Sequence, residues 1–120
     1  MKKHSIFFII TLLALSFGGC KYDFVLPEKT TPIDNGGQPV SFSTQIVPIL
    51  TDNCISCHDT KNPVMLSGVA YSKLVPAYVN TTTPSTSVLY VNAKSGHYAK
   101  VSSSQAALIL QWITEGAKNN

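Results

Sequence analysis

Two cysteines and a histidine in the stretch DNCISCHDT are the residues of this chain most suited to chemistry. Cys54 and Cys57 are separated by two residues, and His58 follows the second cysteine directly. Two thiols at this spacing can form a disulfide, supply half of a zinc site, or attach to the vinyl groups of a haem whose iron is bound by the histidine. The rest of the sequence discriminates among these three chemistries.

The residues around the motif disfavour the first two chemistries. Zinc is typically held by four Cys or His side chains, and apart from Cys20, considered below, only His97 is available beyond the motif after the N-terminal leader. His58 also adjoins Cys57, which strains their joint binding to one ion. A thioredoxin-like dithiol normally lies at a helix start in a βαβ pattern, whereas this pair follows a helical pattern. A redox or structural disulfide remains an alternative.

A haem would use all three side chains of the motif. Both thioether bonds and the bond from His58 to the iron must close on one rigid ring, which accounts for the spacing Cys-x-x-Cys-His. A haem would also add apolar volume to a chain that is otherwise short of core. The sequence therefore predicts one covalent haem c, attached through Cys54 and Cys57.

The N-terminus has the pattern of an export signal. Lys2 and Lys3 precede an apolar run from Ile6 to Phe17, which is too short for a comfortable transmembrane helix. The run ends in FGGC, which resembles a bacterial lipobox, so Cys20 is expected to be lipidated and to become the first residue of the mature protein. An ordinary signal peptide with an incidental cysteine is the alternative. Export to the periplasm or cell exterior also suits covalent haem attachment.

The remaining chain is expected to form one small domain on a tether. We assign residues 1–19 to a lipoprotein signal peptide, residues 20–40 to the lipidated cysteine and a flexible tether rich in Pro, Gly and Thr, and residues 41–120 to the domain. Loss of two lysines with the signal lowers the formal net charge from +3 to +1. No arginine and no basic cluster is present, so nucleic acid is not an expected partner.

Two amphipathic helices are expected to enclose a loop-rich middle, which gives a mainly α fold. Phe42, Ile46 and Ile49 recur at helical spacing before the motif, with Ser41 or Ser43 as a cap and Pro48 expected to distort the first turn. The middle supports at most two short helices, near residues 69–75 and 85–93.

The final helix has the clearest pattern. Ser102 and Gln105 form a capping-box pair at its start, and Gly116 is placed to end it. Its apolar stripe is expected to lie in the core and consists of Leu108, Ile109, Trp112 and Ile113.

These features together resemble a known family. FSTQIVPILTDNCISCH, followed later by ALILQWITEGAKNN, is similar to the single-domain, monohaem cytochromes c of bacterial lipoproteins. The resemblance covers roughly residues 42–120. It implies a small cytochrome c-like domain whose N- and C-terminal helices pack together beside a covalently bound haem, with His58 as the proximal iron ligand.

The distal ligand departs from the usual pattern of that family. Relatives commonly carry a methionine before the last helix, whereas this chain has His97 there. We therefore expect bis-histidine ligation by His58 and His97, which should give a lower potential than a His/Met pair. Met65 is the alternative distal ligand, although it follows His58 by only seven positions. An open sixth site is the third possibility.

The resulting functional prediction is a membrane-anchored electron carrier and not an enzyme. Its partners would be redox proteins of unknown identity, with membership of a larger respiratory or oxidoreductase complex left open. Two rivals remain. One is a haem enzyme or a gas or redox sensor with a labile sixth ligand, and the other is a non-haem interaction lipoprotein with a disulfide.

Overall fold

The computed structural model describes residues 33–95, 97 and 101–120 of the chain. These residues are mainly helical and include no strand, so the prediction of a mainly α fold is confirmed. The elements in chain order are η1 (Phe42–Ile46), α2 (Val47–Asn53), α3 (Ile55–His58), α4 (Ala70–Leu74), η2 (Pro84–Thr86), α5 (Val88–Ser95) and α6 (Ser103–Thr114). The expected signal peptide, Cys20 and residues 21–32 of the tether lie outside the described residues.

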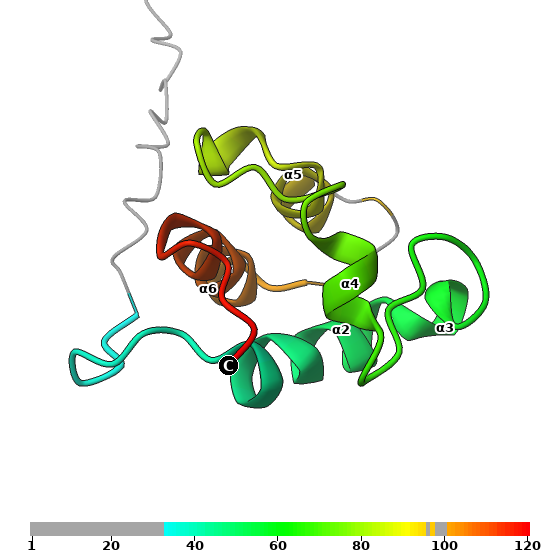
Figure 1. Cartoon of the computed structure of the whole chain (residues 1–120), viewed down its shortest axis with the longest axis horizontal. Helices are drawn as coiled ribbons and strands as arrows, with labels where there is room; N and C mark the ends of the chain where they lie inside the picture. The colour runs from blue at the N-terminus through cyan, green and yellow to red at the C-terminus, as the bar shows by residue number, and fades with distance from the viewer. Residues whose placement is uncertain (1–32, 96, 98–100) are drawn as a thin grey trace, which may run out of the picture.

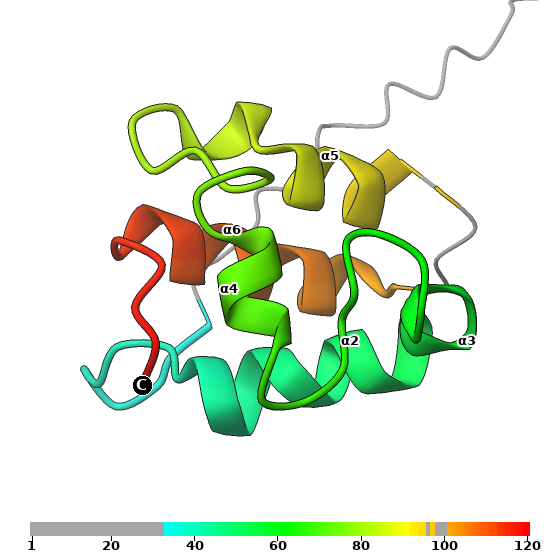
Figure 2. The ribbon, with the colours of Figure 1, turned by 45° about the vertical axis from the view of Figure 1, so that its right-hand side comes forward.

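The helix at the C-terminus lies in the middle of the arrangement. Both ribbon views show α6 between η1–α2 on one side and α5 on the other (Figure 1, Figure 2). In agreement with this, α6 contacts both η1 and α5. The short helix α3 continues from the end of α2 and lies at the edge of the molecule in both views.

The first helix begins with a widened turn because of Pro48. Ser41 caps it, with its Oγ accepting the backbone N–H of Thr44. The residues that follow form a π-helical turn, in which the N–H of Val47 bonds to the carbonyl of Phe42. Pro48 lies at the start of α2, where its missing N–H costs least and the wider turn relieves the clash of its ring with the preceding carbonyls. The expected distortion is confirmed.

Both ends of α6 also follow the sequence signals. The Ser102 side chain accepts the backbone N–H of Gln105, and the Gln105 side chain accepts the backbone N–H of Ser102. At the other end Gly116 has φ +98, which disfavours any residue with a Cβ. The predicted capping box and the predicted stop are therefore confirmed.

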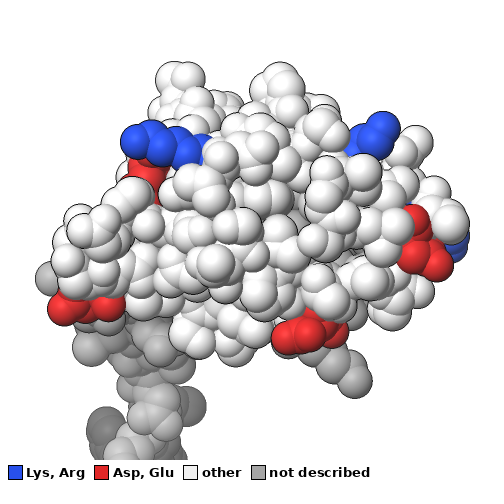
Figure 3. All heavy atoms as spheres, turned by 60° about the horizontal axis from the view of Figure 1, so that its bottom comes forward, with Lys and Arg blue, Asp and Glu red and all other residues white. Residues whose placement is uncertain are grey.

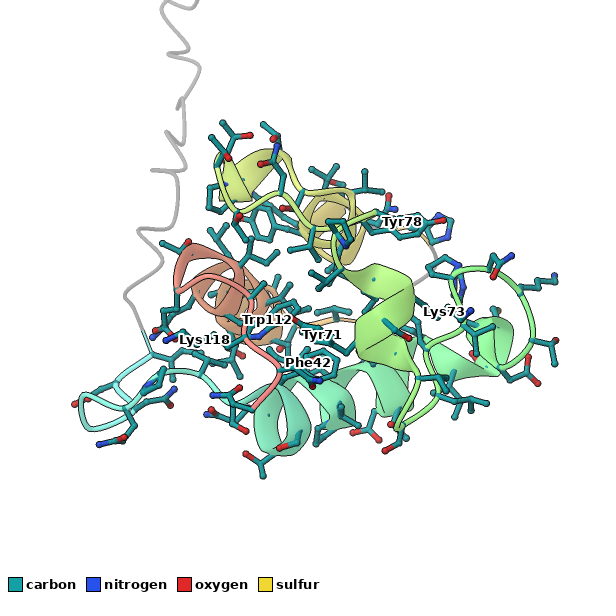
Figure 4. All side chains as sticks on the ribbon, in the orientation of Figure 1. Phe42, Tyr71, Lys73, Tyr78, Trp112 and Lys118 are labelled. Carbon is teal, nitrogen blue, oxygen red and sulfur yellow. The ribbon has the colours of Figure 1, made fainter. Side chains whose placement is uncertain are left out.

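An aromatic cluster joins the two ends of the domain. The Phe42 ring lies 5.1 Å from that of Trp112 and 5.2 Å from that of Tyr71, measured between centroids, and Figure 4 shows the three side chains converging. Trp112 is fully buried, and its Nε1 donates to the carbonyl of Lys118. The Tyr71 hydroxyl donates to the carbonyl of Ala117. The expectation that Trp112 is a core residue is confirmed.

The middle of the chain contains the two short helices that were expected. They are α4 and α5, and the second begins three residues later than the predicted range. The loop between them is closed by the buried Ser87, whose Oγ accepts the N–H of Asn80 at 2.8 Å and donates to its carbonyl at 3.2 Å. These two bonds take the place of regular secondary structure in a segment rich in Thr and Pro.

Residues 33–40, which we call the strap, pack onto the folded domain. The backbone N–H of Ile33 donates to Gln111 at 3.0 Å, and that of Val40 donates to Glu115 at 2.6 Å. Val40 is only 1% exposed. The described end of the expected tether is thus hydrogen-bonded to α6.

Charged side chains are sparse on the face of the molecule shown in Figure 3. Lysines and acidic residues are scattered over it and are not gathered by sign. This face therefore offers no patch that would attract a strongly charged partner.

Candidate functional site

An apolar cleft of about 290 Å³ opens beside the cysteine motif. Its volume lies at the lower end of the range of about 300–1,000 Å³ that is usual for small-molecule and cofactor sites. The lining comes from every α-helix and from the loops between them: Leu50, Asn53, Cys54, Ser56, Cys57, His58, Asn62, Pro63, Met65, Leu74, Tyr78, Val88, Leu89, Asn92, Ala93, His97, Val101 and Ile109. The predicted site residues Cys54, Cys57, His58, His97 and Met65 are all among them.

The motif is held in one turn of helix. Cys54 ends α2, and the backbone N–H groups of Cys57 and His58 both donate to its carbonyl, at 3.1 and 3.0 Å. Residues at positions i, i+3 and i+4 share one face of a helix. For this reason both thiols and the imidazole border the same cleft.

The two cysteines are free thiols in different environments. Cys57 is exposed, whereas Cys54 is partly buried. Burial raises the pKa of the Cys54 thiol above its ordinary value, because the thiolate loses hydration there. Cys54 therefore lies on the inner side of the motif and Cys57 on the outer side.

The His58 ring is oriented by the loop that follows it. Its Nδ1 lies 3.0 Å from the carbonyl oxygen of Pro63 and 3.3 Å from that of Lys61. Carbonyls only accept hydrogen bonds, so this contact requires a proton on Nδ1. In the neutral ring the lone pair is then on Nε2, which is the arrangement of a histidine that binds a metal with its other nitrogen held by a carbonyl.

His97 lies across from His58. The two ring centroids are 6.1 Å apart, although the residues are 39 positions apart in the sequence. The backbone N–H of His97 donates to the carbonyl of Asn92 at 3.3 Å, which ties the residue to the end of α5. An imidazole nitrogen binds a transition metal at about 2 Å, so two rings on opposite sides of one ion have centroids about 6 Å apart. The spacing of the two rings matches this geometry.

Met65 also borders the cleft, from the loop after α3. It is 7% exposed, and its backbone N–H donates to the carbonyl of His58 at 2.9 Å. Both candidate distal residues are therefore at the cleft. Of these two residues, His97 is the one whose side chain lies against the His58 ring.

The donor groups of the cleft suit haem better than a bare ion. Among the described residues, no three His, Cys, Asp or Glu side chains are grouped so that they could hold a metal ion by themselves. In a c-type haem the ring supplies four nitrogen ligands to the iron. The protein then has to provide two thiols, one or two axial ligands and an apolar wall. The cleft contains these groups: the thiols of Cys54 and Cys57, the imidazoles of His58 and His97, and a largely apolar lining.

Sequence reasoning missed several residues of the cleft. Tyr78, labelled in Figure 4, reaches it from the loop after α4, and Asn92 reaches it from α5. Neither belongs to a periodic pattern or a motif. Pro63 could have been found, because a carbonyl partner for the second nitrogen is usual for a metal-binding histidine and the chain turns just after His58.

Comparisons with protein-family models, with curated proteins and with solved structures return no match to this chain. Within the described residues, no helix has the length and hydrophobicity needed to cross a membrane.

Proposed function

We propose that this chain is a membrane-anchored monohaem c-type cytochrome that transfers single electrons. Cys54 and Cys57 would carry the haem, and His58 and His97 would bind its iron, with Met65 as the alternative to His97. Cys20 would carry the lipid that holds the exported domain at a bacterial membrane. The electron donor and acceptor would be other redox proteins.

The observation that carries this proposal is the pairing of the two histidines across the cleft. The sequence predicts His58 as a ligand from the motif and His97 from its place before the last helix, and the centroids of the two rings lie 6.1 Å apart. Both thiols of the motif border the same cleft. Covalent haem attachment needs these groups together on one apolar wall.

The chain would serve electron transfer in three ways. Haem supplies an iron that changes between ferrous and ferric states. The Pro63 carbonyl holds the proton on Nδ1 of His58, which increases the electron density at Nε2 and favours the ferric state. Leu50, Leu74 and Ile109 give the cleft an apolar wall. With both His58 and His97 bound, the iron would have no free position for a substrate, which is why we propose a carrier and not an enzyme.

One observation favours a second function. His97 is exposed, and it follows the end of α5 rather than lying inside a helix. A ligand in such a position is more easily displaced than His58. A haem enzyme or a gas or redox sensor that uses a labile sixth position is therefore the second candidate.

Visible spectra of the protein, produced together with a haem-maturation system, test the proposal. A low-spin c-type spectrum that carbon monoxide does not change, without the far-red band of a thioether ligand, is the expected result. A far-red band would move the distal ligand to Met65. Sensitivity of the reduced protein to carbon monoxide would favour the sensor or enzyme. Absence of haem despite working maturation would refute the cytochrome and favour a non-haem interaction lipoprotein with a Cys54–Cys57 disulfide.

A further inference from the structure

Two polar side chains of the cleft wall take no part in the motif or in iron binding. Tyr78 lies in the loop after α4 and Asn92 lies on α5, and both are half-buried at the cleft. Neither the Tyr78 hydroxyl nor the Asn92 side-chain amide has a hydrogen-bond partner among the described residues. Asn53 differs, since its side-chain amide already donates to the carbonyl of Ile49 at 2.9 Å. Tyr78 and Asn92 are therefore donors that a bound cofactor can use.

The fold places these two residues along α5. The carbonyl of Tyr78 accepts the N–H of Leu89 at 3.0 Å, which attaches Tyr78 at the start of the helix, and Figure 4 shows its side chain beside α5. His97 is bonded to the carbonyl of Asn92 and follows the other end of α5. The helix extends about 9 Å from Leu89 to Ser95. Tyr78 therefore lies near the end of α5 that is remote from His97, with Asn92 between them.

The haem of the proposed function carries two propionate carboxylates that need hydrogen-bond donors. In haem these groups are on the edge of the ring opposite to the vinyl groups. Bonds from the vinyl groups to Cys54 and Cys57 would direct the propionates away from the motif, toward the other wall of the cleft. The polar donors of that wall are Tyr78 and Asn92.

The described lining of the cleft offers no cation to a carboxylate. It includes no lysine and no acidic residue, and the sequence contains no arginine. Lys94, which is on α5, has its Nζ 5.8 Å from the centroid of the Tyr90 ring, and neither residue belongs to the lining. A propionate at this wall would therefore meet neutral donors.

We infer that Tyr78 and Asn92 form a neutral receptor for the haem propionates, whose charge then has no cationic partner. This inference rests on the covalent haem of the proposed function. A negative charge beside the ring stabilises ferric iron more than ferrous iron, because the ferric centre carries one more positive charge. The neutral receptor would thus lower the reduction potential in addition to the effect of the His58/His97 pair.

The covalent mass of the haem and the visible spectrum are recorded first. Absence of haem in the wild-type protein overturns the proposed function, and the inference with it. With haem attached, the two experiments that follow address the receptor alone.

Resonance Raman spectra test the hydrogen bonds to the propionates. Their bending band moves to lower frequency when a donor to the carboxylate is lost. We expect this shift in Tyr78→Phe and in Asn92→Ala, both of which keep the backbone bonds of these residues. The matched control is Tyr71→Phe, because the Tyr71 hydroxyl donates to the Ala117 carbonyl and does not line the cleft. A band that stays unshifted in both cleft variants would overturn the inference, and a shift in one alone would remove the other residue from the receptor.

Reduction potentials test whether the propionate charge lacks a cationic partner. Val88 and Val91 are both exposed on α5, and of the two only Val88 lines the cleft. Val88→Lys should raise the potential, because its ammonium would compensate the propionate charge. Val91→Lys adds the same charge outside the cleft and should leave the potential nearly unchanged. No rise in Val88→Lys, or an equal rise in both variants, would contradict an uncompensated charge at the cleft.

Lysines outside the lining are the alternative partners of the propionates. Lys73 on α4 and Lys94 on α5 are exposed, and loss of a true cationic partner would lower the potential. We expect Lys73→Met and Lys94→Met to keep both the potential and the propionate band of the wild-type protein. A lowered potential together with a shifted band in either variant would replace the neutral receptor by that lysine.

Discussion

His58 is oriented by the loop that follows it. Two backbone carbonyls lie within 3.3 Å of its Nδ1, and its own carbonyl accepts the N–H of Met65. His97 is tied through its backbone to Asn92. Under the proposed function, His58 would therefore approach the iron with its ring already held by backbone carbonyls.

Replacement of the distal residue should change the spin state of the iron. In His97→Ala the sixth position loses its nitrogen, so we expect a high-spin ferric spectrum and binding of carbon monoxide to the reduced protein. Met65→Ala should keep the low-spin spectrum, since the wild-type ligand remains. If Met65→Ala became high-spin and His97→Ala did not, the assignment of the distal ligand would be reversed.

At the scale of elements, a few local interactions determine where α6 begins and ends. Its first turn is closed by the reciprocal bonds of Ser102 and Gln105, and its last turn by the backbone reversal at Gly116. The helix has no acidic residue in its first turn and no basic residue in its last turn. The caps therefore stabilise it without help from side chains that complement the helix dipole.

Removal of the N-terminal cap should cost stability. Ser102→Ala leaves the N–H of Gln105 without its acceptor, and we expect a loss of about 1 kcal/mol in the free energy of unfolding. Denaturant titration, followed by the helical circular dichroism signal, measures it. Ser103→Ala is the matched control, because Ser103 is exposed and lies one residue inside the helix. Equal losses in both variants would show that the cap is not responsible.

A side chain at the helix stop should also be unfavourable. A Cβ at Gly116 meets no atom within 4 Å, so the cost of Gly116→Ala comes from its backbone angle alone. We expect a loss of at least about 1 kcal/mol in the free energy of unfolding. Lys118→Ala, at an exposed position two residues later, should be close to neutral. Thermal unfolding of the two variants side by side checks this difference.

At the scale of the whole molecule, the cleft and the buried core share residues. Leu50 and Ile109 line the cleft and also belong to the buried core. A bound haem would complete this wall with apolar surface. The small domain would then gain stability beyond that of its own core.

Loss of haem attachment should weaken the entire fold. We expect Cys54→Ser/Cys57→Ser to lose its covalent haem and to unfold at a clearly lower temperature than the wild-type protein, with a broader transition. Thr51→Ala, at an exposed position of α2 outside the cleft, should retain both the haem and the melting temperature. Calorimetry on the three proteins provides the measurement. An unchanged transition in the double variant would mean that the core is sufficient without haem.

Local signals in the sequence predict the longer helices, and the motif with His97 and Met65 predicts five of the residues at the cleft. Ser102, Gln105 and Pro48 act on residues within one helical turn. Their effects can therefore be predicted from the adjacent sequence. The remaining features depend on contacts between distant residues. Ile33 meets Gln111 across 78 positions, and no pattern marks either of them. Tyr78 and Asn92 reach the cleft only because α4 and α5 are brought together by the fold.

The closeness of His58 and His97 has a consequence for the unfolded chain. If both rings bind one iron, they close a loop of 39 residues that contains α4, η2 and α5. A cross-link of this length removes conformational entropy from the unfolded state that corresponds to about 4 kcal/mol in the chain-entropy model for disulfides. The axial bonds would then act as a reversible staple across the part of the chain with the least regular structure.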